Sequence, residues 1–447
     1  MMKKQDKIRE SEREADWRAL AEASTEEVAL AMRDLYSIYT AGAVEWIGGL
    51  YDAQSGGFYY SESARDNEPY FADAESTKQA LSFFTSSGLA RSCGGYKNMF
   101  SERVRAKFVY FAKSMQDENG YFYHAGWGKE LTDKKISRRS RDLGWCTSLL
   151  HDFGAKPTYP TPNGYDGDYI DANGRPVSRK RGKTDGDGVA DAPVVYAENL
   201  KDAAAFRAYL DSKDIHERSY HSCSEIITQA SQIVERDRQL AECGEGAQLM
   251  PMLIGWLNEN QHPESGHWHP VSNYYAINGL YKAARIYNAA GLAMPNAAAA
   301  VRSAMAAITS DEPMGAVVDI FNSWSAISYI LSNQRTHGGE AGEALVREVT
   351  AEMRDRATET LACTRQKLSE FRKPDGSFSY TKCASAKISA GMPVAVPDTN
   401  EGDVNATTIA ISGVARAVYE ALGLADKFVP IYTDVDRLLL LAVMGEE

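Results

Sequence analysis

The densest group of chemically active side chains in the sequence is the segment Gly266-His-Trp-His-Pro-Val-Ser-Asn-Tyr-Tyr. Histidine and tyrosine can take a proton from carbon and return one to a leaving oxygen, and asparagine can neutralise a neighbouring carboxylate. These residue types suit β-elimination on a uronate sugar. The candidates for proton transfer are His267, His269 and Tyr274, and those for binding are Asn273, Tyr275 and Trp268. Ring packing behind a turn, with the histidine and tyrosine side chains satisfied in the core, explains the same segment equally well.

A second group consists of acidic residues at expected helix starts. Asp73, Glu75, Asp142 and Asp403 stand at such positions in different parts of the chain. Two carboxylates that face each other across a cavity could hydrolyse a glycosidic bond if their separation suits it. The alternative for each aspartate is an N-cap, whose side chain accepts a hydrogen bond from the first turn of its own helix. The sequence leaves both interpretations open.

Basic, amide and aromatic residues at the same helix starts and turns are candidates for holding a ligand. Arg138, Arg141 and Asn405 can bind acidic or hydroxyl groups, and Glu75 can accept hydrogen bonds from hydroxyls. Aromatic rings can stack on sugar faces, although packing is favoured for most of those near the turns. The stacking candidates are Trp127, Trp145 and Trp268.

One stretch has the beginning of a calcium loop. Asp185, Asp187 and Asp191 lie in Asp-Gly-Asp-Gly-Val-Ala-Asp, which offers oxygen ligands at alternating positions. The glutamate that normally completes such a loop is missing, because position 196 is Tyr196. A polar turn is therefore favoured over a calcium site, and no other cofactor is expected.

Four segments share an acid or amide, a glycine and then aromatic residues, which indicates an internal repeat. Their glycines are Gly57, Gly120, Gly266 and Gly376, and each segment is typical of a tight turn with rings packed behind it. The spacing leaves room for two further units without this signature, near positions 193 and 321. The sequence Asp-Ile-Phe-Asn-Ser-Trp-Ser at 319–325 is interpreted as a remnant of the second.

A helix is expected after each turn. These helices start near Asp73, Arg141, Asn273 and Asp403, run for about four turns and end at glycine. A second helix then leads to the next turn, with examples at 102–116, 247–260 and 343–371. A two-helix unit of this size cannot bury its apolar faces alone, so about six units should close on one another.

The Gly-Gly-Phe and Gly-Ser-Phe turns followed by an Asp- or Asn-led helix resemble the toroids of terpenoid cyclases and protein prenyltransferase β-subunits. More loosely, they resemble six-hairpin glycosidases and toroidal polysaccharide lyases. The resemblance covers residues 40–425 and implies an all-α fold, an (α/α)6 toroid of about six helical hairpins with Gly-aromatic turns, as a single domain over 1–447. The Asp-rich acid motif of the cyclases and the zinc ligands of the prenyltransferases are not found cleanly, which counts against isoprenoid chemistry.

Residues 156–192 interrupt the helical pattern. This insertion contains a small hairpin turned at Asn173-Gly174 and a basic run from Arg179 to Lys183. Its length suits a lid over the mouth of a cavity, and the basic run could attract an acidic ligand. A solvated surface loop is the alternative.

The composition sets the class of protein and its partners. The formal net charge is −12, which argues against nucleic acid as a partner. The chain has no apolar run long enough for a membrane span and no signal-peptide core at its start, and its six scattered cysteines form no CxxC pair. These features predict a reduced, cytoplasmic protein.

Together these features favour a carbohydrate-active enzyme that cleaves short anionic saccharides, with uronate β-elimination ahead of hydrolysis by paired carboxylates. Two other classes remain, an isoprenoid-handling toroid and a non-catalytic ligand-binding toroid. Converging His, Tyr, Arg and carboxylate side chains would favour sugar chemistry. A bare aromatic cavity would favour isoprenoids instead.

Overall fold

The computed structural model describes residues 4–178, 196–246 and 248–446. These residues are mostly helical, and their one sheet is the antiparallel pair β1 (Ile388–Ser389) and β2 (Met392–Pro393). The predicted all-α class is therefore confirmed. None of the helices in the described ranges has the length and apolar character needed to cross a membrane.

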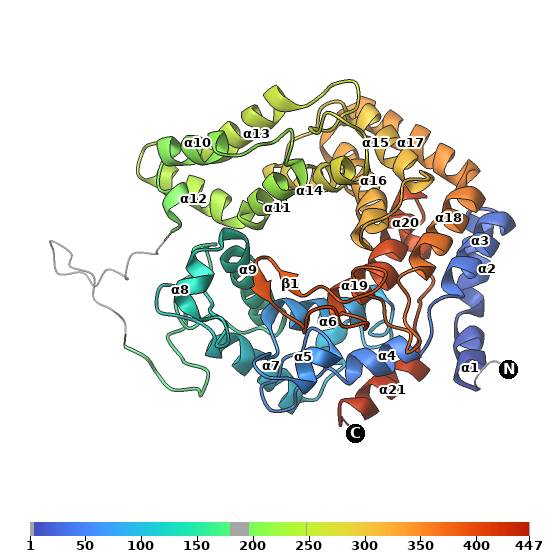
Figure 1. Cartoon of the computed structure of the whole chain (residues 1–447), viewed down its shortest axis with the longest axis horizontal. Coiled ribbons are helices and arrows are strands. Elements are labelled where there is room, and N and C mark those ends of the chain that lie inside the picture. Colours follow the sequence, from blue (N-terminus) through green and yellow to red (C-terminus); the bar gives the residue numbers. More distant parts are fainter. Residues whose placement is uncertain (1–3, 179–195, 247, 447) are drawn as a thin grey trace.

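Among the described residues, six helical segments that contact one another in sequence order form a cycle, and Figure 1 shows them around the middle of the molecule. We call these segments the inner helices. Five of them are single α-helices, and the sixth consists of two α-helices joined by a π-helical turn. They are α6 (Ala74–Ser86), α9 (Ile136–Asp152), α11 (Ser219–Thr228), α14 (Tyr274–Ala290), α16 (Val318–His337) and α19 (Val404–Thr408) with η3 (Ile409–Gly413) and α20 (Val414–Ala421). Their contacts form a closed cycle, because each packs on the next and α19 packs on α6.

The remaining helices lie outside this cycle or at its ends. For example, α7 packs on α9, α15 on α16, and α17 on both α16 and α20. These helices are α1 (Lys4–Glu12), α2 (Glu14–Ala23), α3 (Glu26–Tyr36), α4 (Gly42–Gly48), α5 (Glu62–Asp66), α7 (Glu102–Ser114), α8 (Gly128–Asp133), α10 (Ala203–Asp211), α12 (Ala230–Glu242), α13 (Leu249–Asn260), α15 (Ala297–Ile308), α17 (Gly339–Asp355), α18 (Ala357–Ser369) and α21 (Asp434–Val443). Short 3-10 turns occur at η1 (Tyr96–Asn98), η2 (Glu198–Leu200) and η4 (Ala425–Lys427).

Three of the expected helix starts are confirmed by their caps. The side chains of Asp73, Asn273 and Asp403 accept hydrogen bonds from the backbone of Ser76, Ala276 and Ala406. The fourth start was wrong, because α9 begins at Ile136 and places Asp142 in its second turn. A run of Ser and Arg residues continues the helix upstream without Gly or Pro, so nothing stops it earlier.

Two of the Gly-aromatic turns are held in the same way, which supports the repeat. The backbone N–H of Phe58 donates to Thr77 Oγ1, and Phe58 O accepts from the N–H of Asp73. The backbone N–H of Phe378 likewise donates to Thr407 Oγ1, and Phe378 O accepts from Asp403. In both copies the threonine follows the capping aspartate by one helical turn. The turn and the inner helix are thus joined at two points.

Two expectations for the second half of the chain are wrong. Residues 319–325 form the beginning of α16 rather than a remnant turn, since they contain no glycine and Asp319 accepts hydrogen bonds from Gly315 and Ala316. The helix expected over 343–371 is two helices, α17 and α18, that meet at Arg356. The unit expected near 193 lies outside the described residues.

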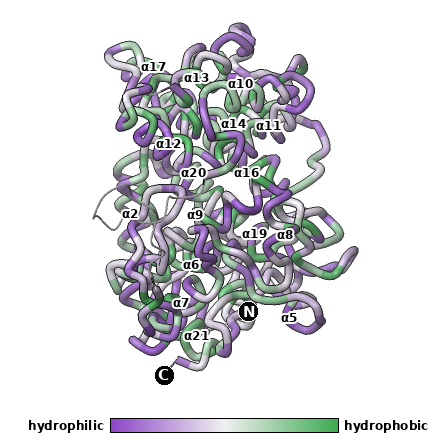
Figure 2. The backbone as a smooth tube through the Cα atoms, turned by 90° about the vertical axis from the view of Figure 1, so that its left-hand side faces the viewer, coloured by the Kyte–Doolittle hydropathy of each residue, from purple (hydrophilic) through white to green (hydrophobic). Residues whose placement is uncertain are grey.

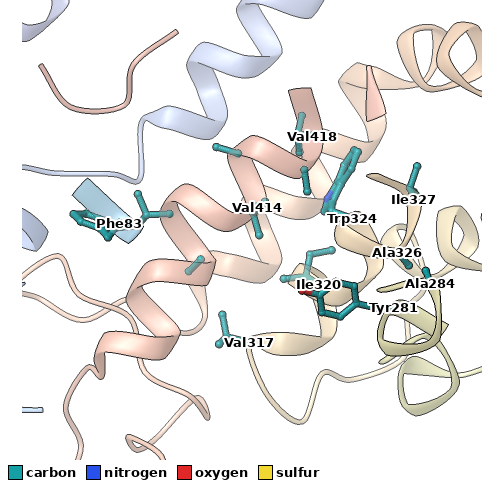
Figure 3. Close-up of a cluster of buried hydrophobic side chains, with 14 of the residues drawn as sticks. Phe83, Tyr281, Ala284, Val317, Ile320, Trp324, Ala326, Ile327, Val414 and Val418 are labelled. Atoms are coloured by element: carbon teal, nitrogen blue, oxygen red, sulfur yellow. The ribbon is translucent and has the colours of Figure 1, made fainter. Parts of the chain in front are cut away.

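Part of the apolar core lies between neighbouring inner helices (Figure 3). Trp324 of α16 is fully buried among Ile320, Ile327, Val414 and Val418, and its indole N–H donates to Thr364 Oγ1 at 2.9 Å. Both chain ends lie at the same end of the molecule (Figure 2), where α1 packs on α21. The first and last helices are thereby joined by a contact between residues that are distant in sequence.

The described part of the insertion, residues 156–178, packs against outer helix α7 and the second half of α9. Asp168 pairs with Lys113 at 2.7 Å, and Asn163 Nδ2 donates to Thr147 Oγ1 at 3.1 Å. The turn at Asn173-Gly174 is confirmed, with Ile170 bridged to Pro176. The basic run from Arg179 to Lys183 lies outside the described residues, so the lid stays a prediction.

Candidate functional site

The first turn of α6 and the first two turns of α9 bring together several of the predicted site residues as a buried ion network. Arg138 donates to Glu75 at 2.8 Å and to Asp142 at 2.6 Å, and Arg141 donates to Glu75 at 2.6 Å. Asp73 caps α6 beside them, within the electrostatic reach of Arg138. Arg138 is fully buried, whereas Arg141 is half-buried and presents the accessible edge of the network.

Three carboxyl groups share two guanidinium groups here, so one negative charge is in excess. Although burial opposes ionisation, Arg141 and Arg138 lower the pKa of Glu75 to about 2. Burial raises the pKa of Asp142 to about 7, with Asp73 and Glu75 adding to the rise. Burial also raises the pKa of Asp73, against the effect of Arg138. Glu75 is therefore the stable anion of the network, while Asp73 and Asp142 are the carboxyl groups that take up a proton more readily.

The segment that includes β1 and β2 reaches this network from the C-terminal part of the chain. Ser389 Oγ donates to Glu75 Oε2 at 3.0 Å, and the indole N–H of Trp127 donates to Pro393 O at 3.1 Å. Figure 1 shows β1 beside α9 at the middle of the molecule. Sequence analysis missed Ser389, because nothing in the local pattern relates this loop to α6.

Asp403 is buried at the start of α19 and is separate from the Arg138 network. It accepts hydrogen bonds from the backbone N–H groups of Ala406 at 2.7 Å and Ala386 at 3.3 Å. The Tyr60 hydroxyl lies beside it. Burial raises the pKa of Asp403 to about 7. The hydrogen bonds fit a structural cap, and the carboxyl group is 0% exposed.

Two of the three residues considered for proton transfer point into packed surroundings. His267 is buried, its Nε2 lies 2.8 Å from Ser272 Oγ, and burial lowers its pKa to about 4. Tyr274 is also buried, and its hydroxyl accepts a hydrogen bond from Lys367 of outer helix α18 at 2.8 Å. The structure does not bring either of them to the Arg141 network.

The third residue, His269, belongs to a different cluster of rings. The Tyr275 hydroxyl lies 2.7 Å from Nδ1 of His221, and the rings of His269 and Tyr220 lie 5.6 and 5.9 Å from the Tyr275 ring. His221 is exposed, while Tyr220, His269 and Tyr275 are half-buried. Both His221 and Tyr220 are on α11. The sequence singled out His221 only as half of a weak metal pair with Cys223, and Tyr220 was not predicted at all, because their neighbour Tyr275 is 54 positions away from His221.

Tyr220 connects these rings to the ion network. Its hydroxyl interacts electrostatically with Arg141, Asp319 and Tyr275, and Tyr380 interacts with both Tyr220 and Arg141. Burial raises the pKa of Tyr220, and burial and then Arg218 lower the pKa of His221. We define the central polar cluster by its members. They are Glu75, Arg141, Tyr220, His221, Tyr275 and Tyr380.

The predicted stacking residues divide into packed and partly accessible rings. Trp268 is fully buried, with its indole N–H donating to Leu257 O, so it packs in the core. Trp127 is half-buried, and the Arg138 guanidinium lies 5.2 Å from its ring. Trp145 is half-buried one turn after Arg141 on the same face of α9. Its buried indole N–H has no hydrogen-bond partner among the described residues.

Asparagines predicted to bind ligand have structural partners. Asn273 caps α14, and Asn405 Oδ1 accepts a hydrogen bond from Gln79 Nε2 at 3.0 Å. Gln79 Nε2 also lies 3.4 Å from Glu75 Oε1, so Gln79 links Asn405 to the ion network.

A polar stripe runs along α14, and the sequence had singled out only its first member, Tyr275. Tyr275, Asn278, Lys282 and Arg285 follow one another at helical spacing along a helix whose other residues are mostly buried. Asn278 donates to Asp319 of α16 at 2.9 Å. The spacing of these polar residues was the signal that could have revealed the stripe.

Within the described ranges, no group of three or more His, Cys, Asp or Glu side chains could hold a metal ion. The predicted calcium loop at Asp185, Asp187 and Asp191 lies outside those ranges. The six cysteines are free thiols.

Comparison of the chain with family models, with curated proteins and with solved structures finds no match.

Proposed function

We propose that this chain is an enzyme that cleaves a short acidic saccharide by β-elimination at the centre of an (α/α)6 toroid. The closed cycle of inner helices and the outer helices packed on them support a toroid of helical hairpins. The central polar cluster lies at the beginnings of α9, α11 and α14, which share one end of the cycle. In such a toroid this end forms the mouth of the site.

The observation that carries the proposal is the contact between Tyr275 and His221. A tyrosine hydroxyl at 2.7 Å from an imidazole nitrogen can pass its proton to that nitrogen when it accepts another. The lowered pKa of His221 keeps the imidazole neutral at neutral pH, so it is able to accept this proton. Both rings are accessible enough to meet a ligand.

In the proposed elimination, Tyr275 is the base and Tyr220 is the acid. Tyr275 transfers its proton to His221 and takes the proton from C5 of the uronate, and the C5–H electron pair forms the C4–C5 double bond. The bond from C4 to the glycosidic oxygen breaks, and Tyr220 donates its hydroxyl proton to that oxygen. The raised pKa of Tyr220 keeps it protonated for this role, and Arg141 provides positive charge for the substrate carboxylate.

Hydrolysis is less well supported. Asp73, Glu75, Asp142 and Asp403 are between 0 and 3% exposed, and each accepts a hydrogen bond from a helix N-terminus or an arginine. Asp142 Oδ2 has no partner among the described residues, but it is buried as well. A glycosidase needs a carboxyl group within reach of the bond that it cleaves. An isoprenoid site is also less well supported, because charged groups rather than bare rings occupy the middle of the molecule.

A panel of uronate oligosaccharides tests the proposal. Elimination gives new reducing ends together with an unsaturated uronate that absorbs at about 230 nm, and both signals are expected. Reducing ends without this absorbance would instead assign hydrolysis to the carboxylates. If no substrate gives either signal, the result contradicts the proposed enzyme.

A further inference from the structure

Lys282 and Arg285 bring positive charge to the middle of the molecule without a matching carboxylate. They lie one turn apart on α14 and are half-buried. In the part of the chain that the structure describes, neither side chain forms an ion pair, whereas most other arginines do. Charged groups in such positions normally have a partner, so these two have charge available for a ligand.

Aromatic rings hold the two side chains in place. Lys282 Nζ lies 4.4 Å from the centre of the Tyr281 ring and 5.9 Å from that of Tyr220. The Arg285 guanidinium lies 5.6 Å from the Tyr281 ring and 5.9 Å from the Tyr329 ring. Ring faces attract cations but leave their hydrogen-bond donors free. Arg285 also forms a side-chain hydrogen bond with the Tyr281 hydroxyl. The other guanidinium donors of Arg285 and the ammonium group of Lys282 thus remain available to an oxyanion.

The charge balance around these residues is locally positive. Lys282 interacts electrostatically with Arg285, Arg141 and Glu75. Glu75 is the one acid among them, and it is already shared by Arg138 and Arg141. Burial and then the two arginines lower the pKa of Lys282 well below its usual value. These effects oppose the charged form of Lys282, and a bound anion would offset them and favour the ammonium ion. The positive charge is local, because the chain as a whole carries −12.

We infer that Lys282 and Arg285 bind a second acidic group of the saccharide, a carboxylate or a sulfate on a sugar next to the one held at Arg141. This inference rests on the proposed function, because it takes the ligand to be the acidic saccharide of that site. Lys282 gives a point charge and Arg285 a planar pair of donors, a combination that suits either oxyanion. The contact with Tyr220 connects this subsite to the residue assigned to protonate the leaving oxygen.

Binding of three hexasaccharides, measured by titration calorimetry at low ionic strength, tests the inference. The probes are maltohexaose, which is uncharged, hyaluronan hexasaccharide, which has only carboxylates, and chondroitin 4-sulfate hexasaccharide, which has both groups. We expect at least one acidic probe to bind more tightly than maltohexaose, and Lys282→Met and Arg285→Gln each to weaken that binding by about 10-fold. A larger loss with the sulfated probe assigns sulfate, and an equal loss assigns carboxylate.

Matched variants separate a specific site from a change in overall charge. Lys97→Met and Arg347→Gln remove the same charges from the exposed surface and should bind as the original protein does. Lys282→Arg keeps the charge and should retain most of the affinity. Circular dichroism and melting check that each variant is folded. Unchanged binding by folded Lys282→Met and Arg285→Gln, or no preference for either acidic probe, would overturn the inference.

The same samples distinguish this inference from the proposed reaction. If the variants lose affinity but no probe gains absorbance at about 230 nm, the acidic subsite stands and elimination of these probes fails. If a probe is eliminated at the original rate and affinity by both variants, the reaction stands and the subsite is overturned.

Discussion

The Tyr275 hydroxyl lies 2.7 Å from Nδ1 of His221, although the two residues belong to separate inner helices. The packing of α11 on α14 creates this contact, because it sets the first turns of the two helices beside each other. Tyr220 lies against the same pair and interacts with Arg141 of α9. Three consecutive inner helices therefore contribute to one group of proton-carrying and charged side chains.

Tyr275→Phe should reduce kcat/KM for the cleaved uronate by about 100- to 10,000-fold, because it removes the hydroxyl that takes the proton from carbon. Melting should change little, since the ring and its packing remain. Tyr110→Phe is the matched control, because Tyr110 is exposed on the outer helix α7. Equal activities of the two variants would rule out the assigned role of Tyr275.

Glu75→Gln should lower the free energy of unfolding by about 3–5 kcal/mol, because it leaves Arg138 buried with one fewer anion and Arg141 without its partner. Urea unfolding measures this change. Glu348→Gln breaks an exposed pair with Arg302 and should cost less than about 1 kcal/mol. If both variants lose the same small amount, the ion network has no structural role.

Asp403→Asn should change how stability depends on pH. The pKa of Asp403 is raised to about 7 in the folded protein, against about 4 in an unfolded chain. The folded state then holds a proton that the unfolded chain has lost, so this group makes the free energy of unfolding fall as pH rises between these values. Asparagine still caps the helix and does not titrate, so the variant should gain stability relative to the original protein as pH rises.

Urea unfolding at about pH 5 and about pH 8 measures the difference. Asp211→Asn, at an exposed site on α10, is the control and should not alter the pH dependence. If the free energy of unfolding of Asp403→Asn differs from that of the original protein by the same amount at both pH values, the raised pKa of Asp403 is contradicted.

The repeat of the Gly-aromatic turn gives a paired prediction. Thr77→Val and Thr407→Val each leave a buried backbone N–H without its acceptor, on Phe58 and Phe378, and each should cost about 1–3 kcal/mol of unfolding free energy. Thr77→Ser and Thr407→Ser keep the hydroxyl and should cost less. A large effect at one site and none at the other would show that the two turns are not equivalent.

Local patterns in the sequence predicted the fold class and several helix starts, because an N-cap depends only on neighbouring residues. Asp73, Asn273 and Asp403 were found in this way. Asp142 was misplaced at a helix start, because no local signal marked where α9 begins. The start of α9 depends on the residues that precede the helix more than on the presence of Asp142.

The candidate site was harder to predict, because its residues meet only after the helices have packed. Tyr274 and Tyr275 are adjacent in sequence, yet one hydroxyl meets Lys367 of an outer helix and the other meets His221 of an inner helix. The choice between them depends on how α14 is rotated about its axis. The helical spacing of the polar residues Asn278, Lys282 and Arg285 indicated this rotation, because Tyr275 lies on the same face of α14 as they do.

The mass of the products tests the central claim most directly. Elimination divides the saccharide without adding water, so the two fragments together should have the mass of the substrate, and neither should take up oxygen from ¹⁸O-labelled water during cleavage at C4. Mass spectrometry of a single turnover of a uronate tetrasaccharide measures both quantities. We predict conserved mass and an unsaturated uronate at the new non-reducing end of the fragment that comes from the reducing side of the substrate. Fragments that together contain one additional, labelled water would contradict β-elimination and establish hydrolysis.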